Sequence, residues 1–377
     1  MHDDRGTGMN VGGISRAAFA AGVYAALICW TSLAQGADQA WDQLVAAARA
    51  EGKIVVVGPP DADVRRELPR AFKKRFDIDL EYIGGRGRSS AARIATERAA
   101  GHYTADAVIA GLSTLAIVYY REKMLDPLKP ALVLPEVLDG SKWKRGGLWF
   151  VDPEKNYVLR ISNNVQRSFY INTAKVKADE IRSIKDLVDP KWRGKIAMDD
   201  PTLSGSGLTL AARVYISQGE GFVKKLFVDQ KPRISRDRRQ LADWLVRGTY
   251  PIVFNAGDDD VAEARKQGFP VKEVDDVIGL PLTTSAGFGM IGLLNRAPHP
   301  SAAKVFVNWI ASKEGMEIYS RARAEVPTRN DIDEASYLTP EAIPKPGVEY
   351  FDTYDWDFVV TKRAQIRRIM KKLMAKK

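Results

Sequence analysis

The chain has 377 residues, of which 45% are hydrophobic and 28% are charged. At about 150 residues per domain, this length predicts two domains with substantial cores and argues against disorder or a coiled coil. One cysteine and three histidines exclude a disulfide framework, a cysteine-rich zinc or iron–sulfur site and most histidine chemistry. The formal net charge of +10 would suit a nucleic-acid or membrane-surface partner if it were spread over the molecule.

The positive charge is concentrated at the C-terminus. Residues 362–377 contain eight lysines or arginines and no acid, so most of the net charge lies in this tail. Its apolar residues recur at intervals of three and four, which predicts an amphipathic helix: Ile366, Ile369, Met370 and Leu373. We interpret its charged face as solvated and distant from any ligand, and we expect no nucleic-acid partner. Binding of this face to a membrane surface or to nucleic acid is the alternative.

The first 36 residues have the pattern of a secretory signal peptide. Two arginines precede an uncharged, apolar stretch over residues 17–37, and Ala34 and Gly36 supply the small residues for cleavage before Ala37. A membrane anchor is the alternative, but the stretch is rich in alanine and barely long enough to span about 30 Å. We therefore expect a periplasmic protein whose mature form has no cysteine, which suits an oxidising compartment.

Strands and helices are predicted to alternate along the mature chain. A helix over residues 38–51 is followed by KIVVVG (53–58), a run of β-branched residues typical of a strand buried on both faces of a parallel sheet. Further helices are predicted over 64–76, 89–100 and 207–218, and further strands over 78–83, 105–110, 169–172, 195–198 and 251–255. This alternation predicts an α/β protein with two doubly wound sheets.

Three long runs carry a family resemblance. WDQLVAAARAEGKIVVVG (41–58), SFYINTAKVKADEIRSIKDLVDPKWRGKIAMDDPTLSGSG (168–207) and TSAGFGMIGLLNRAPHPSAAKVFVNWIASKEGMEIYS (284–320) resemble extracellular solute-binding proteins of bacterial ABC transporters, in the ferric-ion and small-anion branch. The resemblance implies the type II periplasmic binding fold, in which hinge strands join two lobes around a ligand cleft. It implies a first lobe of residues 38–161 plus 284–330 and a second of 162–283 plus 331–377. It also implies an ABC transporter permease in the inner membrane as the partner, and we expect a monomer.

The loop GGRGRSS (84–90) is the best local signal for the ligand site. In open α/β sheets, ligands lie beyond the carboxyl ends of the strands, where helices begin. Glycines allow close approach of the backbone, Ser89 can cap a helix or donate to an oxyanion, and Arg86 or Arg88 can grip a carboxylate or phosphate. The competing interpretation is a glycine-rich turn with a serine cap and two solvated arginines.

Five further candidates lie where other predicted strands or helices begin or end. Ser113 follows a strand of the first lobe, and Ser204 and Ser206 precede a helix of the second, where each serine can donate to an anion or cap the helix. Tyr170 lies on the strand that enters the second lobe, where it can line the cleft or pack in the core. Asp258 can meet an amine or cation in the cleft, or complement a helix dipole.

The tyrosines depart from what the resemblance implies for iron. Ferric binders of this branch use an adjacent tyrosine pair near the strand that corresponds to residues 251–255, where this chain reads FNAGDDDV. The adjacent pair Tyr119 and Tyr120 lies in an apolar helical stretch, where core packing is the better interpretation. We therefore expect a small organic anion and no metal or cofactor. A ferric or other metal–anion complex is the alternative.

Enzyme motifs point away from catalysis. The sequence lacks a Walker phosphate loop, H-E-x-x-H and G-x-S-x-G. GFGMIG (287–292) matches G-x-G-x-x-G, but it lies in a predicted strand and does not open a helix, as a dinucleotide site requires. We predict a receptor without catalytic residues, with an exported enzyme on a similar two-lobe scaffold as the alternative.

Overall fold

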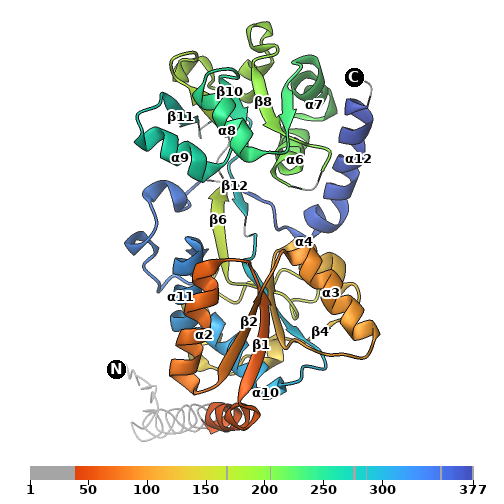
Figure 1. Ribbon diagram of the computed structural model, residues 1–377, viewed down its shortest axis with the longest axis vertical. Helices are drawn as coiled ribbons and strands as arrows, with labels where there is room; N and C mark the ends of the chain where they lie inside the picture. Colours follow the sequence, from red (N-terminus) through yellow and green to blue (C-terminus); the bar gives the residue numbers. More distant parts are fainter. Residues whose placement is uncertain are drawn as a thin grey trace, which may run out of the picture.

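Two α/β lobes stacked along the long axis make up the molecule (Figure 1). The computed structural model describes residues 39–166, 169–203, 205–274, 277–285, 287–348 and 350–375. The predicted signal peptide, residues 1–36, lies outside the described residues. Among the helices of the described ranges, none combines the length and the apolar character that crossing a membrane requires. The two-lobe α/β fold predicted from the sequence is confirmed.

The lobe in the lower half of Figure 1, here called the lower lobe, contains the first sheet and corresponds to the predicted first lobe. Strand β1 (Lys53–Gly58) lies between β2 (Asp79–Gly84) and β3 (Ala107–Ala110), and both run parallel to it. A strand from much later in the chain, β13 (Met290–Leu294), then runs antiparallel to β3. The sheet is completed by two short strands that pair with β13, β4 (Leu125–Asp126) and β5 (Leu159–Arg160). Because β13 joins this sheet, the chain enters the lower lobe twice.

Helices cover both faces of this sheet, as the sequence of β1 predicts. Ile54 and Val56 point into one core, which also contains aromatic side chains of the helices on that face. Val55 and Val57 point into the opposite core. The first face is covered by a helix over residues 39–51, α2 (Ala62–Phe76), α10 (Pro300–Ala311) and α11 (Lys313–Arg323). The second is covered by α3 (Gly87–Ala99), α4 (Leu112–Thr114) and a π-helix, Leu115–Tyr120.

The upper lobe is built around a second mixed sheet. Its strand order is β11 (Val271–Val274), β7 (Phe169–Asn172), β10 (Ile252–Phe254), β8 (Ile196–Asp199) and β9 (Arg233–Ser235). Strands β8, β9 and β10 are parallel, and β7 is antiparallel to both of its neighbours. The helices of this lobe are α6 (Ser206–Gln218), α7 (Glu220–Lys224) with the π-helix Lys225–Asp229, α8 (Arg238–Val246) and α9 (Asp258–Lys266).

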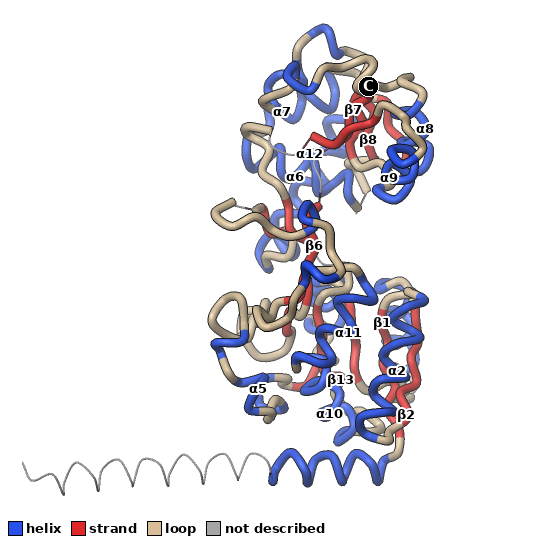
Figure 2. The backbone as a smooth tube through the Cα atoms, turned by 90° about the vertical axis from the view of Figure 1, so that its left-hand side faces the viewer, coloured by secondary structure: helices blue, strands red, loops and turns tan. Residues whose placement is uncertain are grey.

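A narrow third sheet joins the lobes. Figure 2 shows β6 (Ser162–Gln166) in the waist between them. It pairs with β12 (Thr283–Ser285) and β14 (Val326–Pro327), and β12 also pairs with β15 (Phe351–Asp352). Short helical turns complete the described fold: Lys129–Ala131, α5 (Pro135–Leu138), Gly140–Lys142, Ala178–Glu180, Ile184–Val188, Pro190–Trp192, Glu334–Ser336 and Pro340–Ala342.

Buried charges tie the third sheet to the lower lobe. Glu325 is buried. It accepts a hydrogen bond from Ser162 and forms an ion pair with Arg323 at 3.0 Å. Arg323 also pairs with Asp61 at 3.0 Å. Burial acts to lower the pKa of Arg323, but the two carboxylates outweigh it and raise that pKa. The network therefore fixes the base of the waist through ion pairs of Arg323 with two carboxylates.

The C-terminal part of the chain contacts both lobes. After β14, Ile332 is buried in the core of the lower lobe, so this stretch differs from the expected assignment of residues 331–377 to the second lobe. We name residues 351–375 the C-terminal segment. It begins with β15, continues as a π-helix (Phe358–Lys362) against α4 of the lower lobe, and ends with α12 (Arg363–Met374) packed on α6 of the upper lobe (Figure 1). The segment thus bridges the waist.

Candidate functional site

A cavity of about 420 Å³ lies between the lobes beside the C-terminal segment. Three parts of the chain form its walls: the N-terminal turns of α3 and α4 with the adjoining π-helix, the N-terminus of α6, and the C-terminal segment. The described lining residues are Arg88, Ser113, Ile117, Gly205, Leu208, Tyr354, Val359, Val360, Arg363, Ala364 and Arg367. The cavity is therefore bounded by both lobes, as a closing receptor cleft requires.

The lower wall is set by two helices that begin close together. Helix α3 starts at Gly87, and a Cβ at that position would lie 2.9 Å from the hydroxyl oxygen of Thr114 in α4. A Cβ at Gly111, which precedes α4, would lie 2.5 Å from the carbonyl oxygen of Gly287. Glycine at both positions permits this approach. As a result, Arg88 of α3 and Ser113 of α4 line the same cavity.

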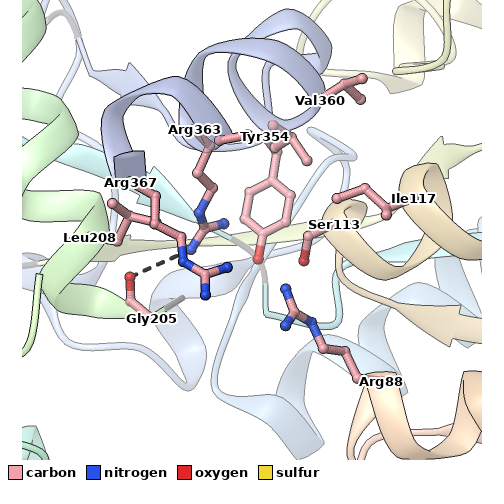
Figure 3. A pocket seen from close by; sticks show the side chains of 11 residues that line it. Arg88, Ser113, Ile117, Gly205, Leu208, Tyr354, Val360, Arg363 and Arg367 are labelled. Carbon is pink, nitrogen blue, oxygen red and sulfur yellow. Dashed lines mark hydrogen bonds between the residues drawn. The ribbon is translucent and has the colours of Figure 1, made fainter. Parts of the chain in front are cut away.

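Two arginines of α12 form the wall opposite Arg88. Arg363 and Arg367 are one helical turn apart, so both side chains leave the same face of α12. The Nη2 of Arg363 donates to the carbonyl oxygen of Gly205 at 3.4 Å, and the Nε of Arg367 donates to that of Thr202 at 3.2 Å. These bonds dock the α12 arginines on the loop that precedes α6. Figure 3 shows the three guanidinium groups of the cavity turned toward one space.

Arg363 is poised to accept an anionic partner. Its Nε is buried and has no hydrogen-bond partner in the described structure. Burial lowers the pKa of the Arg363 guanidinium, and the charge of Arg88 lowers it further, while Tyr354 acts in the opposite direction. An anion beside Arg363 would offset both its burial and the repulsion from Arg88, and would therefore stabilise the charged guanidinium.

Tyr354 is held in the cavity by an ion pair between Asp352 and a buried arginine. The side chain of Arg160 is fully buried, and its Nη1 donates to Asp352 at 2.9 Å. The same carboxylate accepts from the backbone N–H of Tyr354 at 2.9 Å, which fixes the turn after β15. Burial raises the pKa of Tyr354, so its hydroxyl stays protonated at neutral pH and can donate or accept a hydrogen bond.

None of the described residues that line the cavity is acidic, while three are arginines. Like charges that line one cavity repel each other unless a counter-ion lies between them. The hydroxyl groups of Ser113 and Tyr354 add neutral hydrogen-bonding groups beside the arginines. This arrangement suits an anionic ligand and would repel a bare cation.

The N-terminus of α6 is occupied by a carboxylate of the protein itself. Ser206 donates its hydroxyl to Asp199 at 2.6 Å, and the backbone N–H of Gly207 donates to the same oxygen at 2.9 Å. Asp199 thus takes the place at the helix N-terminus that we predicted for an external anion. Ser206 does not line the cavity, and Ser204 lies outside the described residues.

Two other candidates are placed away from the cavity. Tyr170, only 2% exposed, packs in the upper core with residues of α8 and α9, which corrects its proposed role in the cleft. Phe169 faces the opposite core and packs its ring against Phe254. Because both faces of β7 are covered, Phe169 and Tyr170 are both buried although their side chains point to opposite faces. Asp258 begins α9, and its side chain is not among those described.

The arginine loop divides between the cavity and the surface. Arg86 is the N-cap residue of α3 and is exposed, and Ser89 donates its hydroxyl to the carbonyl oxygen of Arg86 at 3.1 Å. Neither lines the cavity, so the structure leaves Arg88 as the arginine of this loop that faces the cleft.

The basic C-terminal helix lies beside the cavity, which corrects the prediction of a solvated helix distant from any ligand. Ile366 and Met370 are buried against the upper lobe, as the apolar periodicity predicts, but Arg363 and Arg367 line the cavity instead of facing solvent. The spacing of four between these arginines was a usable signal, since it puts them on one face beside the apolar stripe. Their position relative to the cleft depends on the path of residues 331–362, which no local pattern gives.

The side chains that a metal site could use are placed as follows. In the described ranges, no three His, Cys, Asp or Glu side chains are grouped so that they could hold a metal ion. Tyr119 is buried in the core, and Tyr120 donates its hydroxyl to Glu154 at 2.6 Å and packs against Tyr157 and Trp356. The adjacent tyrosines thus have structural partners, as predicted.

Solved structures of similar fold come from several bacteria. IdiA (FutA) of Trichodesmium, solved with iron and citrate, is 19% identical with a TM-score of 0.64, over 85% of this chain and 99% of that one. AfuA of Actinobacillus pleuropneumoniae, solved with fructose-6-phosphate, is 20% identical with a TM-score of 0.55, over 86% and 98%. An ABC transporter protein of Clostridium perfringens is 16% identical with a TM-score of 0.65, over 85% and 99%. At these identities the likeness establishes the fold.

Sequence comparisons extend over most of the chain. An uncharacterized protein of Haemophilus influenzae is 23% identical over 288 residues, which cover 72% of this chain and 76% of that protein. The family model of bacterial extracellular solute-binding proteins matches residues 67–346 and includes Arg88 and Ser113. Tyr354, Arg363 and Arg367 lie beyond its end. Since the match spans well over half of the sequence and agrees with the two-lobe fold, the chain belongs to the bacterial extracellular solute-binding protein family.

Proposed function

We propose that this protein is a periplasmic receptor that captures a small organic anion between its lobes and delivers it to an ABC importer. The observation that carries the proposal is the convergence of Arg88, Arg363 and Arg367 on one cavity with no acidic residue among the described lining side chains. Arginine pairs with carboxylate and phosphate oxygens through two parallel hydrogen bonds, which makes it the best-suited side chain for either group.

Closure of the cleft would follow from the distribution of these arginines. Arg88 belongs to the lower lobe, whereas Arg363 and Arg367 are docked on the upper lobe through Gly205 and Thr202. An anion that contacts both sets binds more tightly when the lobes approach, so it shifts the population toward the closed form. The permease would then recognise that form. Export to the periplasm through the predicted signal peptide completes the proposal.

The ligands of two structural neighbours support the proposal of an anionic ligand. The Trichodesmium protein was solved with iron and citrate, and the Actinobacillus protein with a sugar phosphate. An anion–metal complex therefore stays within the ligand class that the cavity suits, whereas bare ferric ion would meet three positive charges. We assign no reaction to this cavity. Among its described lining residues, the hydroxyl groups belong to Ser113 and Tyr354, and both lie beside arginines.

Thermal-shift and calorimetric screening of phosphate, phosphate monoesters and carboxylates tests this function. We expect at least one of these anions to stabilise the protein, since a ligand that binds the folded state raises its stability by mass action. Arg88→Ala should weaken binding at least tenfold, which corresponds to about 1.4 kcal/mol. Arg86→Ala is the matched control, because Arg86 lies in the same loop and is exposed, like Arg88, but does not line the cavity.

Two outcomes of this screen would contradict the proposal. Stabilisation by neutral sugars or amines alone would show that the arginines do not select the ligand. Equal binding by both arginine variants would show that the anion binds elsewhere.

A further inference from the structure

The cavity has an apolar side that an inorganic anion would leave unused. Ile117 of the lower lobe is 41% exposed and Val360 of the C-terminal segment is 42% exposed, and both line the cavity. Leu208, Val359 and Ala364 add further apolar surface to the lining, with Leu208 close to Arg367 (Figure 3). In Figure 3, Ile117 and Val360 lie on the side of the cavity away from Arg363 and Arg367. The cavity therefore combines three arginines with aliphatic side chains, and Ile117 and Val360 form an apolar part of its wall away from Arg363 and Arg367.

The polar groups available for the body of a ligand are few. Apart from the arginines, the described lining side chains that can form hydrogen bonds are Ser113 and Tyr354. A ligand rich in hydroxyls, such as a sugar, would bury several donors and acceptors against Ile117 and Val360 without partners. Unpaired polar groups weaken binding strongly, whereas a hydrocarbon chain gains from the same surface.

We infer that the ligand is an amphiphilic anion, a phosphate monoester or phosphonate with a short hydrocarbon body. The inference rests on the proposed function and specifies its ligand. The doubly charged phosphoryl group would lie among Arg88, Arg363 and Arg367, because a dianion compensates three guanidiniums better than a single carboxylate does. The hydrocarbon would lie against Ile117 of the lower lobe and Val360 of the C-terminal segment.

Three of the lining residues that carry this inference, Val360, Arg363 and Arg367, come from the C-terminal segment beyond the matched family region. The segment would therefore determine specificity in addition to completing the cavity wall. Its π-helix contacts α4 of the lower lobe and α12 packs on α6 of the upper lobe, so both groups of ligand contacts are anchored. A change of this segment would alter ligand preference without changing the two-lobe fold.

Titration calorimetry with n-butyl phosphate, glycerol 3-phosphate and inorganic phosphate tests the inference. The two esters share the phosphoryl group and differ in the polarity of the body. Each methylene group moved from water to apolar surface contributes a factor of about four in affinity. We therefore expect the affinity for n-butyl phosphate to exceed that for glycerol 3-phosphate by a factor of about ten or more.

Serine variants of the apolar side provide the second arm. Ile117→Ser and Val360→Ser should each bring the ratio of the two ester affinities toward one, because a hydroxyl disfavours the hydrocarbon and favours the glycerol. Ile216→Ser is the matched control, since Ile216 is exposed on α6 and does not line the cavity, and it should keep the wild-type ratio. Circular dichroism and melting curves establish that each variant is folded.

The outcomes separate this inference from the proposed function. If glycerol 3-phosphate binds as tightly as n-butyl phosphate, or if the serine variants keep the wild-type ratio, the amphiphilic ligand is wrong while an anion receptor stands. If none of the three phosphates binds, and carboxylates such as citrate also fail, the anion receptor is wrong and this inference fails with it.

Discussion

Arg363→Ala should weaken binding of the phosphate or carboxylate ligand at least thirtyfold. The buried Nε of this side chain has no hydrogen-bond partner in the described structure, and its guanidinium lies in the same cavity as Arg88. Hydrogen bonds to a charged partner contribute about 1.5–3 kcal/mol, and each 1.4 kcal/mol is a factor of ten in affinity. Titration calorimetry of wild type and variant with the stabilising anion measures the effect.

Arg368→Ala is the control for this variant. Arg368 lies in the same helix, is exposed and does not line the cavity. Its replacement therefore removes one positive charge without changing the ligand site. The account expects less than a threefold change for this control at moderate salt, since long-range attraction between exposed charges is screened. Equal losses for both variants would mean that net charge, and not the cavity, attracts the anion.

Met370→Ala should lower both stability and ligand affinity. Met370 is completely buried in the interface between α12 and the upper lobe, so the substitution leaves a cavity and is expected to reduce the free energy of unfolding by about 2–4 kcal/mol. Because α12 carries Arg363 and Arg367, loosening it also displaces two of the three cavity arginines. Denaturant unfolding and calorimetry on the same preparation measure the two losses.

Lys371→Ala separates the packing of α12 from its charge. Lys371 is exposed, so its replacement should change the free energy of unfolding by no more than about 0.5 kcal/mol and leave affinity nearly unchanged. If Met370→Ala loses stability but keeps wild-type affinity, α12 has no part in the ligand site. The earlier expectation of a solvated helix distant from the ligand would then be correct.

Local patterns were sufficient to predict the sheets. The predicted strands at residues 53–58 and 169–172 have the bounds of β1 and β7, because their continuous apolar runs reflect burial on both faces. GFGMIG was interpreted as part of a strand, and β13 begins at Met290 within it. A Cβ at Gly292 would lie 3.0 Å from the side chain of Leu125, so this glycine serves close packing in the sheet.

The arginine loop could be found from the sequence, but its orientation could not. Both arginines precede the helix predicted over residues 89–100, so helical periodicity could not say which of them faces the cleft. In the structure α3 begins two residues earlier, at Gly87. Arg88 therefore lies in its first turn and lines the cavity, whereas Arg86 is the extended N-cap residue and does not.

The remaining errors arise from contacts between distant segments. The hydroxyl of Ser206 is engaged by Asp199, which precedes the loop at the end of β8 and reaches the start of α6 from outside the helix. Arg363 and Arg367 depend on where residues 331–362 lead the chain. Tyr354 depends on the ion pair between Asp352 and Arg160 across the waist. Periodicity describes one element at a time and therefore cannot supply these positions.

A crystal structure of the protein grown with n-butyl phosphate tests the central claim most directly. We expect one ester in the cavity between the lobes, with phosphoryl oxygens within hydrogen-bond distance of Arg88 and Arg363 and with the lobes closed around it. An ester bound outside this cavity, or one whose phosphoryl group contacts neither arginine, would contradict the assignment of the ligand site to the lower lobe and the C-terminal segment.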